Sequence, residues 1–194
     1  MRFTAGTLQH NVNFWKTIIN NCYVLNIVSG YAFEFNDAFT EVMSSTQPLM
    51  SKFDKFTSDR ISAQVDELFS IHVVEECSHC EGEYISPIFL VEKINSVYRK
   101  ILNLKRCNVC VEYCHFEIEH LKTVCDLINR GSFMSSIDLR KVYYSVSISV
   151  NSRKYLNEWN NKLYQYRALP NGLSSGPRIF SNIIRELLSL VDIE

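Results

Sequence analysis

Helix-like and strand-like patterns alternate along this chain, and that mixture most constrains its fold. Apolar residues between Val12 and Ile19 recur at the spacing of one helix face. By contrast, Asn160-Asn161 separates two short β-rich segments, Tyr155–Trp159 and Lys162–Tyr166. Asparagine tolerates the positive φ angles of a tight hairpin turn, so these segments predict a β-hairpin. Both patterns in one chain predict an α+β fold.

Further helices follow from capping residues and apolar spacing. Ser58 is a candidate cap for a helix with an apolar face from Ile61 to Phe69, and Pro177 suits the first turn of another. A third helix is predicted from Ile118 to Ile128, with Gly131 just beyond its end. Each of these helices has one apolar side, which predicts packing against a shared core.

Strands are predicted in the remaining β-rich segments. Ser86–Val91 and Tyr98–Leu104 are predicted to form a hairpin with its turn at Lys93–Ser96. Two further strands are predicted over Phe133–Leu139 and Val142–Val150. Tyr31–Phe35 is predicted to be a short strand or an extended arm. The stretch 36–55 lacks periodicity and contains Pro48, so we interpret it as a connector. We therefore expect an N-terminal arm and connector over residues 1–57 and a main domain over 58–194.

Composition limits the classes of protein that need consideration. The 194 residues are 46% hydrophobic, as in globular proteins, and the net charge is −1. Bulk charge therefore does not indicate nucleic-acid binding, and the argument depends on local patches. No apolar run approaches the ~20 residues of a membrane span, and the first 13 residues lack the apolar core of a signal peptide. We expect no membrane association and an intracellular location in cytoplasm or nucleus, without secretion.

Charge is unevenly distributed along the sequence. From Lys93 to Arg106 there are five basic residues and no acidic one, and Arg140–Arg167 is also rich in basic residues. The segment Asp54–Glu83 contains eight acidic and two basic residues. A basic face beside an acidic one is typical of a groove that binds phosphates.

Three segments, in this order, carry a resemblance to a known family. They are Ser86–Val91 with Tyr98–Lys105, then Ser136–Val146 around Asp138, then Leu169–Phe180 with the sequence Leu-Pro-Asn-Gly-Leu. Together they resemble the reverse transcriptase domain of retrotransposon polyproteins, and the segment from Phe14 to Tyr31 is similar to DIRS-like elements, with gypsy-like elements as the alternative. The resemblance implies a partial right-hand polymerase, with fingers and part of the palm after an N-terminal helical arm.

The resemblance also assigns a catalytic and metal-binding residue. Nucleotide addition is an in-line phosphoryl transfer assisted by two divalent ions, and Mg²⁺ prefers carboxylate and carbonyl oxygens. In the family pattern, Asp138 is the first catalytic aspartate and a ligand of Mg²⁺ or Mn²⁺, together with the backbone carbonyl of Leu139. Asp138 is expected at the end of a palm strand, near the Asn171-Gly172 loop.

The same resemblance implies contacts with dNTP and with an RNA or DNA primer–template. Lys93 and Arg99 would face the triphosphate, since lysine offers a point charge and arginine a bidentate fork. Tyr143 would pack on the sugar. Asn171 and Gly172 would lie under the nucleotide, with glycine allowing close approach of the backbone. Lys105 and Arg153 are the predicted nucleic-acid contacts.

The chain also departs from the family pattern. The Tyr-x-Asp-Asp sequence that supplies the other catalytic aspartates does not occur in these 194 residues. Lys141-Val142 stands where an acidic residue and alanine are usual, and Glu92–Ser96 replaces the usual Pro-Lys-Lys-Asp-Gly turn. We therefore expect a fragment truncated before that motif, inactive alone and binding metal poorly, with downstream polyprotein segments as possible partners.

Two other functions stay open. One is a non-catalytic remnant that binds nucleic acid, since binding residues survive where the catalytic set is incomplete. The other is a zinc module, because the spacings of Cys77 and Cys80, and of Cys107, Cys110 and Cys114, are those of zinc ligands. The seven cysteines lack a secretory signal, so we otherwise expect reduced thiols.

Overall fold

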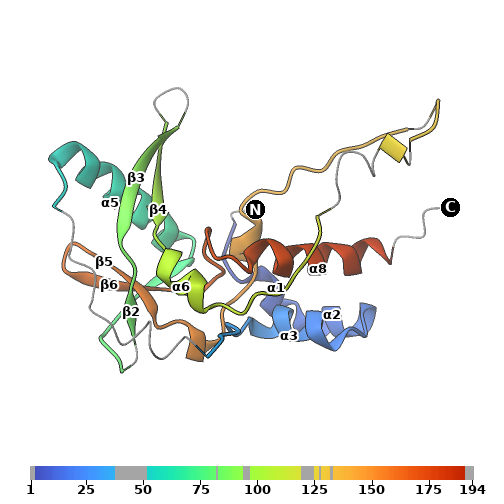
Figure 1. Ribbon diagram of the computed structural model, residues 1–194, viewed down its shortest axis with the longest axis horizontal. Coiled ribbons are helices and arrows are strands. Elements are labelled where there is room, and N and C mark those ends of the chain that lie inside the picture. Colours follow the sequence, from blue (N-terminus) through green and yellow to red (C-terminus); the bar gives the residue numbers. More distant parts are fainter. Residues whose placement is uncertain are drawn as a thin grey trace.

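The computed structural model describes residues 3–37, 52–81, 83–93, 97–118, 125–126, 128–131 and 133–190, and Figure 1 shows their arrangement. Its helices are α1 (Thr7–His10), α2 (Val12–Ile18), α3 (Cys22–Gly30), α5 (Lys55–Ser70), α6 (Lys105–Cys110) and α8 (Gly176–Leu188), with short 3₁₀ helices η2 (Val142–Ser145) and η3 (Val150–Ser152). Its strands are β1 (Val74–Cys77), β2 (Tyr84–Ile85), β3 (Ile88–Lys93), β4 (Val97–Leu102), β5 (Tyr155–Trp159) and β6 (Lys162–Tyr166). The predicted α+β character is confirmed.

The strands form two sheets. The larger has the order β1-β6-β5-β2, in which only the β2–β5 pair is parallel. Strands β5 and β6 have the predicted bounds, and Asn160 and Asn161 take φ angles of 50° and 59° at their turn. These angles are those of a two-residue hairpin turn, so the predicted hairpin is confirmed. Strands β3 and β4 pair antiparallel as a separate hairpin.

Helix α5 joins the two sheets. Gln64 accepts a hydrogen bond from the Lys100 backbone N–H at 2.7 Å, so the helix contacts strand β4. On its other side, the indole of Trp159, at the end of β5, donates to Ser62 at 3.0 Å. Asp54 caps the helix by accepting from the Thr57 N–H at 2.7 Å. The expected cap at Ser58 is thus wrong, because Ser58 already lies within the first turn.

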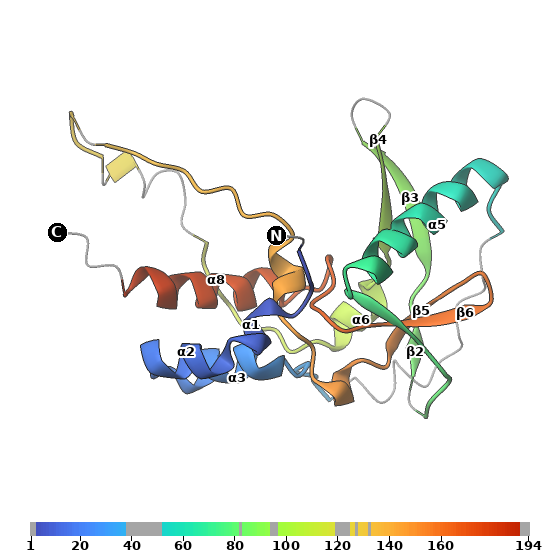
Figure 2. The same cartoon turned by 180° about the vertical axis from the view of Figure 1, so that it is seen from behind.

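The N-terminal helices lie beside α8, at the opposite end of the molecule from the sheets (Figures 1 and 2). Asn21 caps α3 and also donates to Glu186 of α8 at 3.0 Å. Near the start of α8, the buried Arg178 contacts Glu34 and Tyr23. Pro177 lies in the first turn of α8, as predicted.

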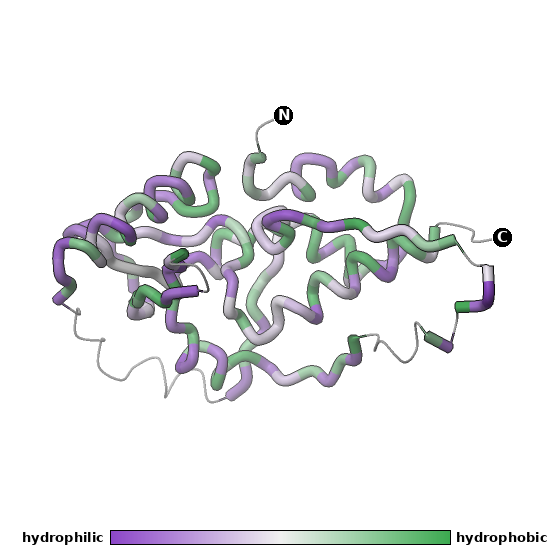
Figure 3. The backbone as a smooth tube through the Cα atoms, turned by 90° about the horizontal axis from the view of Figure 1, so that it is seen from above, coloured by the Kyte–Doolittle hydropathy of each residue, from purple (hydrophilic) through white to green (hydrophobic). Residues whose placement is uncertain are grey.

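One main core connects these layers. It includes Val28 from α3, Ile61 from α5, Ile148 and Leu169 from the loops, and Ile179 from α8, each almost completely buried. Hydrophobic and hydrophilic residues alternate along the helices in Figure 3, as expected for helices with one buried side. Among the helices of the described residues, none has the length and apolar character of a membrane span.

The predicted strand Phe133–Leu139 is wrong. Among the described residues this segment has no pairing strand, and it extends away from both sheets in Figure 1. Phe133, Met134 and Ile137 are largely exposed. A strand is stable only when a neighbouring strand satisfies its backbone groups, so an alternating pattern alone does not produce one.

Two further predictions need correction or lie outside the described residues. The expected strand Val142–Val150 instead forms η2 and η3 with isolated bridges at Ser147 and Ile148 between them. The segment after the β3–β4 hairpin forms the helix α6. The helix expected from Ile118 to Ile128 falls mostly outside the described residues.

Candidate nucleotide-binding site

A cavity of about 390 Å³ opens between α5, β4 and the turn that follows β6. Its lining is Gln64, Glu67, Leu68, Arg99, Lys100, Ile101, Leu102, Lys141, Tyr144, Tyr166, Asn171 and Gly172. These residues come from five separate parts of the chain, so the cavity exists only in the folded protein. Its volume lies in the range of small-molecule sites.

Three residues predicted for nucleotide binding meet in this cavity. Arg99 comes from β4, while Asn171 and Gly172 come from the turn after β6, more than seventy positions later. The Asn171 amide donates to the Tyr144 hydroxyl at 2.8 Å. This hydrogen bond fixes the turn against η2 on the cavity wall.

A second asparagine holds the turn from the other side. Asn108 of α6 donates to the Gly172 carbonyl at 2.9 Å and accepts from the Ser174 N–H at 2.9 Å. Gly172 has a φ of 97°, a conformation that glycine adopts most readily. A Cβ there would meet only the Leu102 carbonyl oxygen at 3.9 Å. The backbone conformation therefore favours glycine here, and the close approach of this backbone to a nucleotide stays a prediction.

Lys100 forms part of the cavity floor. Its ammonium lies 3.4 Å from the Tyr166 hydroxyl and near the ring of the same tyrosine. Burial lowers the pKa of Lys100 to about 8, because the charged form loses hydration. Burial likewise raises the pKa of both Tyr144 and Tyr166, which keeps the two hydroxyls protonated.

The cavity is cationic overall. Its lining holds three basic side chains, Arg99, Lys100 and Lys141, and one acidic side chain, Glu67. Lys141 pairs with Glu67 at 2.7 Å, so Arg99 and Lys100 are the uncompensated charges among the lining residues. Such a cavity attracts an anion of small-molecule size, such as a phosphate ester.

Sequence reasoning missed several of these residues. Alternation places Arg99 and Lys100 on opposite faces of a strand, so only Arg99 was expected at the site. Tyr144 adjoins the predicted Tyr143, but the ring of Tyr143 packs on Phe180 of α8 with centroids 6.0 Å apart. No signal in the sequence distinguishes the two neighbours, because the turn of η2 decides which one faces the cavity.

Other predicted residues lie outside the cavity. Lys93 is exposed at the end of β3, and Lys105 is exposed at the start of α6. Arg153 pairs with Glu75 of β1 at 3.2 Å, and its side chain is 17% exposed. The roles of these three residues in nucleic-acid binding stay predictions.

Asp138 is exposed in the segment that forms no strand. Neither it nor Leu139 lines the cavity with Asn171 and Gly172, so the expected position on a palm strand is wrong. Among the described residues no three His, Cys, Asp or Glu side chains converge as a metal site. Asp138 therefore belongs to no such group, whereas a two-ion centre needs several converging carboxylates.

The cysteines show no zinc site within the described residues either. Cys107 and Cys110 are buried in and around α6, whereas Cys80 is exposed on a loop. Burial raises the pKa of Cys107 to about 12, which favours the neutral thiol over the thiolate that binds zinc.

Comparison with known proteins identifies the class of fold. The foamy viral protease–reverse transcriptase in complex with an RNA/DNA hybrid superposes with a TM-score of 0.65 at 17% identity, covering 99% of this chain and 28% of that one. The same enzyme in complex with double-stranded DNA gives a TM-score of 0.64 at 15% identity, covering 99% and 42%. The chain therefore has a reverse-transcriptase-like fold.

Sequence relatives agree with that fold, although no family model matches the chain. The Pol polyprotein of the transposon opus from Drosophila melanogaster is 22% identical over 159 residues, 76% of this chain. The Pro-Pol polyprotein of Simian foamy virus type 1 is 24% identical over 105 residues, 53% of this chain. This chain spans 16% and 9% of those polyproteins, and it is related to their reverse transcriptase region.

Proposed function

We propose that this chain is the nucleotide- and template-binding front part of an RNA-directed DNA polymerase from a retrotransposon Pol polyprotein, DIRS-like or gypsy-like. The intact enzyme would add dNTPs to a primer inside the cell, in cytoplasm or nucleus. The observation that carries this proposal is the cationic cavity in which Arg99, Asn171 and Gly172 meet. The relatives among Pol polyproteins support it.

In this proposal the cavity holds the incoming dNTP. Arg99 and Lys100 bind the triphosphate, because both cations lack a carboxylate partner among the described residues of the cavity. The Asn171-Gly172 turn supports the nucleotide, and the hydrogen bond from Asn171 to Tyr144 keeps that turn in place. Tyr143 stays the predicted sugar contact, with Tyr144 as the ring that lines the cavity here.

The metal ions belong to the intact enzyme. Mg²⁺ or Mn²⁺ would be held in part by the Asp138 carboxylate and the Leu139 carbonyl. In the described residues these groups belong to no cluster of three or more metal-binding side chains, so they alone do not fit a two-ion centre. We therefore propose that the 194 residues bind nucleotide without transferring it.

The primer–template would lie over the basic residues around the β3–β4 hairpin. Lys93, Arg99 and Lys105 are exposed there, and no ion pair is described for any of them. Solved structures of the foamy viral enzyme contain double-stranded DNA and an RNA/DNA hybrid, which supports nucleic acid as the partner. Since phosphate contacts release counterions, affinity should fall steeply with salt.

The test measures dTTP binding by titration calorimetry at constant ionic strength. Arg99→Gln should weaken binding about tenfold, because it removes a charged hydrogen bond to phosphate. Lys162→Gln is the matched control, since Lys162 carries the same charge, is exposed and pairs with Glu76 away from the cavity. Equal affinity of the two variants would refute the cavity as the nucleotide site.

A non-catalytic nucleic-acid-binding protein is the second candidate. The position of Asp138, exposed and outside the cavity, favours it. It predicts salt-dependent binding of primer–template together with no measurable affinity for dTTP. The calorimetric titration therefore separates the two functions.

A further inference from the structure

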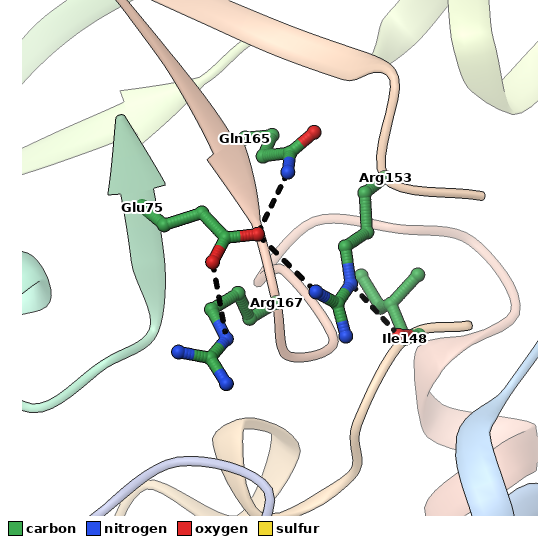
Figure 4. Close-up of polar contacts among 5 residues, drawn as sticks. All are labelled: Glu75, Ile148, Arg153, Gln165 and Arg167. Atoms are coloured by element: carbon green, nitrogen blue, oxygen red, sulfur yellow. Dashed lines mark hydrogen bonds and ion pairs between the residues drawn. The ribbon is translucent and has the colours of Figure 1, made fainter. Parts of the chain in front are cut away.

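A second cationic cluster lies where side chains of β1, β6 and the neighbouring loops meet (Figure 4). Glu75 of β1 pairs with Arg153 at 3.2 Å and with Arg167 at 3.4 Å, and it accepts from Gln165 at 2.7 Å. The Nε of Arg153 also donates to the Ile148 carbonyl at 3.2 Å. One carboxylate thus faces two guanidinium groups.

The charges in this cluster do not balance. The contacts within the described structure use Nε and one terminal nitrogen of Arg153, but only Nε of Arg167. In Figure 4 both terminal nitrogens of Arg167 and one of Arg153 carry no interaction. Arg153 is the more enclosed, with 17% of its side chain exposed against 43% for Arg167. An enclosed surplus cation is costly unless an anion compensates it.

A small hollow lies beside the two guanidinium groups. It is lined by Ala5, Gly6, Gln9, His10, His72, Ser147, Arg153 and Arg167, which are mostly polar, and no carboxylate is among them. Its volume of about 30 Å³ admits two or three oxygen atoms, on the scale at which one water needs about 10–15 Å³. A nucleoside does not fit, whereas two or three of the four oxygens of one phosphate ion do.

The hollow is separate from the nucleotide cavity, although residues that are neighbours in the sequence line the hollow and the cavity. Tyr166 lines the cavity and Arg167 lines the hollow, because successive side chains of an extended segment point to opposite sides. The Arg167 backbone is fixed between Val73 and Ile148 by hydrogen bonds of 2.9 and 2.8 Å. This backbone therefore holds the guanidinium at the rim of the hollow.

We propose that Arg153 and Arg167 form a binding site for a single phosphate group, distinct from the nucleotide site and independent of polymerase function. Each guanidinium donates its remaining terminal N–H groups to phosphate oxygens, the geometry that arginine favours. Glu75 orients both arginines and limits their net charge. The phosphate is either a free ion or one phosphate of a nucleic-acid backbone.

The test uses the full chain in two arms, both at constant ionic strength. One arm titrates inorganic phosphate and follows its ³¹P linewidth, and the other measures binding of a short DNA duplex without terminal phosphates. Arg153→Gln should weaken the phosphate interaction about tenfold relative to the Lys162→Gln control. Glu75→Gln should strengthen it about threefold, because it removes the competing carboxylate.

Arg153→Gln is expected to weaken phosphate binding and Glu75→Gln to strengthen it. Either variant alone therefore tests the proposal if the other is unstable. A response of both variants to inorganic phosphate alone identifies a site for a free ion, and a response to the duplex identifies a backbone phosphate. Unchanged affinity in both arms for Arg153→Gln, or weaker binding by a folded Glu75→Gln, would overturn the proposal and leave a purely structural ion-pair cluster.

Discussion

The β5–β6 hairpin and the segment Phe133–Leu139 have similar strand-like sequences but very different structures. The two strands of the hairpin pair with each other, and with β1 and β2 on either side they form a four-stranded sheet. The other segment, which carries Asp138, has no partner strand among the described residues and exposes its apolar side chains. A β-rich sequence therefore forms a strand where a turn brings its partner alongside, and otherwise depends on a more distant segment.

Primer extension is the strongest test of whether the Asp138 segment forms a catalytic centre. We expect the 194-residue chain to give no detectable extension with Mg²⁺ or Mn²⁺, because Asp138 belongs to no cluster of three or more metal-binding side chains among the described residues. Each missing group that stabilises the transition state commonly costs several kcal/mol. A chain fused to a family Tyr-x-Asp-Asp hairpin and thumb is the positive control. Extension by the unfused chain that Asp138→Ala abolishes would show that the segment does form a catalytic centre.

Hydrogen exchange compares the two regions directly. Among the described residues, none from Phe133 to Arg140 donates a backbone hydrogen bond, whereas the amides of β6 pair with β1 and β5. We expect amides of Leu163–Tyr166 to exchange at least about a thousandfold more slowly than those of Phe133–Leu139. Mass spectrometry of peptides covering both regions measures the ratio. Comparable protection would mean that the Asp138 segment pairs in solution.

Local determinants explain which elements the sequence predicts. The bounds of β5 and β6 and the start of α8 depend on Asn160-Asn161 and Pro177, which act within a few residues. The loop around Ser147 and Ile148 depends instead on distant contacts. Tyr31 donates to the Ser147 carbonyl at 2.8 Å, and Ile148 donates to that of Arg167 at 2.8 Å. Alternation there indicates burial on one side but not a strand.

The residues of the candidate site likewise fall into those that the sequence predicts and those that depend on distant contacts. Arg99, Asn171 and Gly172 were predicted because they belong to motifs that carry the family resemblance. Lys100 and Gln64 were not, because their position depends on how α5 contacts the edge of β4. Sequence motifs thus predict the residues that a family shares, while packing between elements determines the rest of the cavity.

Two isoleucines allow the core and the Asp138 segment to be compared by their contributions to the free energy of unfolding. Ile148 is 1% exposed in the main core, and Ile137 is 83% exposed in the Asp138 segment. Ile148→Ala should lower the free energy of unfolding by about 2–5 kcal/mol, since it leaves a cavity in packed surroundings. Ile137→Ala should change it by less than about 0.5 kcal/mol. Urea unfolding measures both, and a similar loss for Ile137→Ala would place that side chain in a core.

The smallest expected effect is a pH dependence that distinguishes the enclosed Lys100 from exposed basic residues. Burial lowers the pKa of Lys100 to about 8 from the usual 10.5, so the folded state binds this proton less tightly than the unfolded state. The penalty for protonation is complete below pH 8, and it is relieved as pH rises above the folded pKa. The contribution of Lys100 to the free energy of unfolding should therefore rise on the order of 1 kcal/mol between pH 8 and 9.5.

Buried thiols and tyrosines change stability in the opposite direction. Burial raises the pKa of Cys107 to about 12, so the unfolded state loses this thiol proton first within the same window. Burial raises the pKa of Tyr144 and Tyr166 above the usual 10, so at higher pH the unfolded state loses tyrosine protons first and stability falls. Lys100→Met should remove the gain between pH 8 and 9.5, whereas Lys162→Met, at an exposed position, should leave it in place. If urea unfolding shows the same slope for Lys100→Met as for the unchanged chain, another group is responsible. Lys100 would then be no more enclosed than the exposed basic residues of the chain.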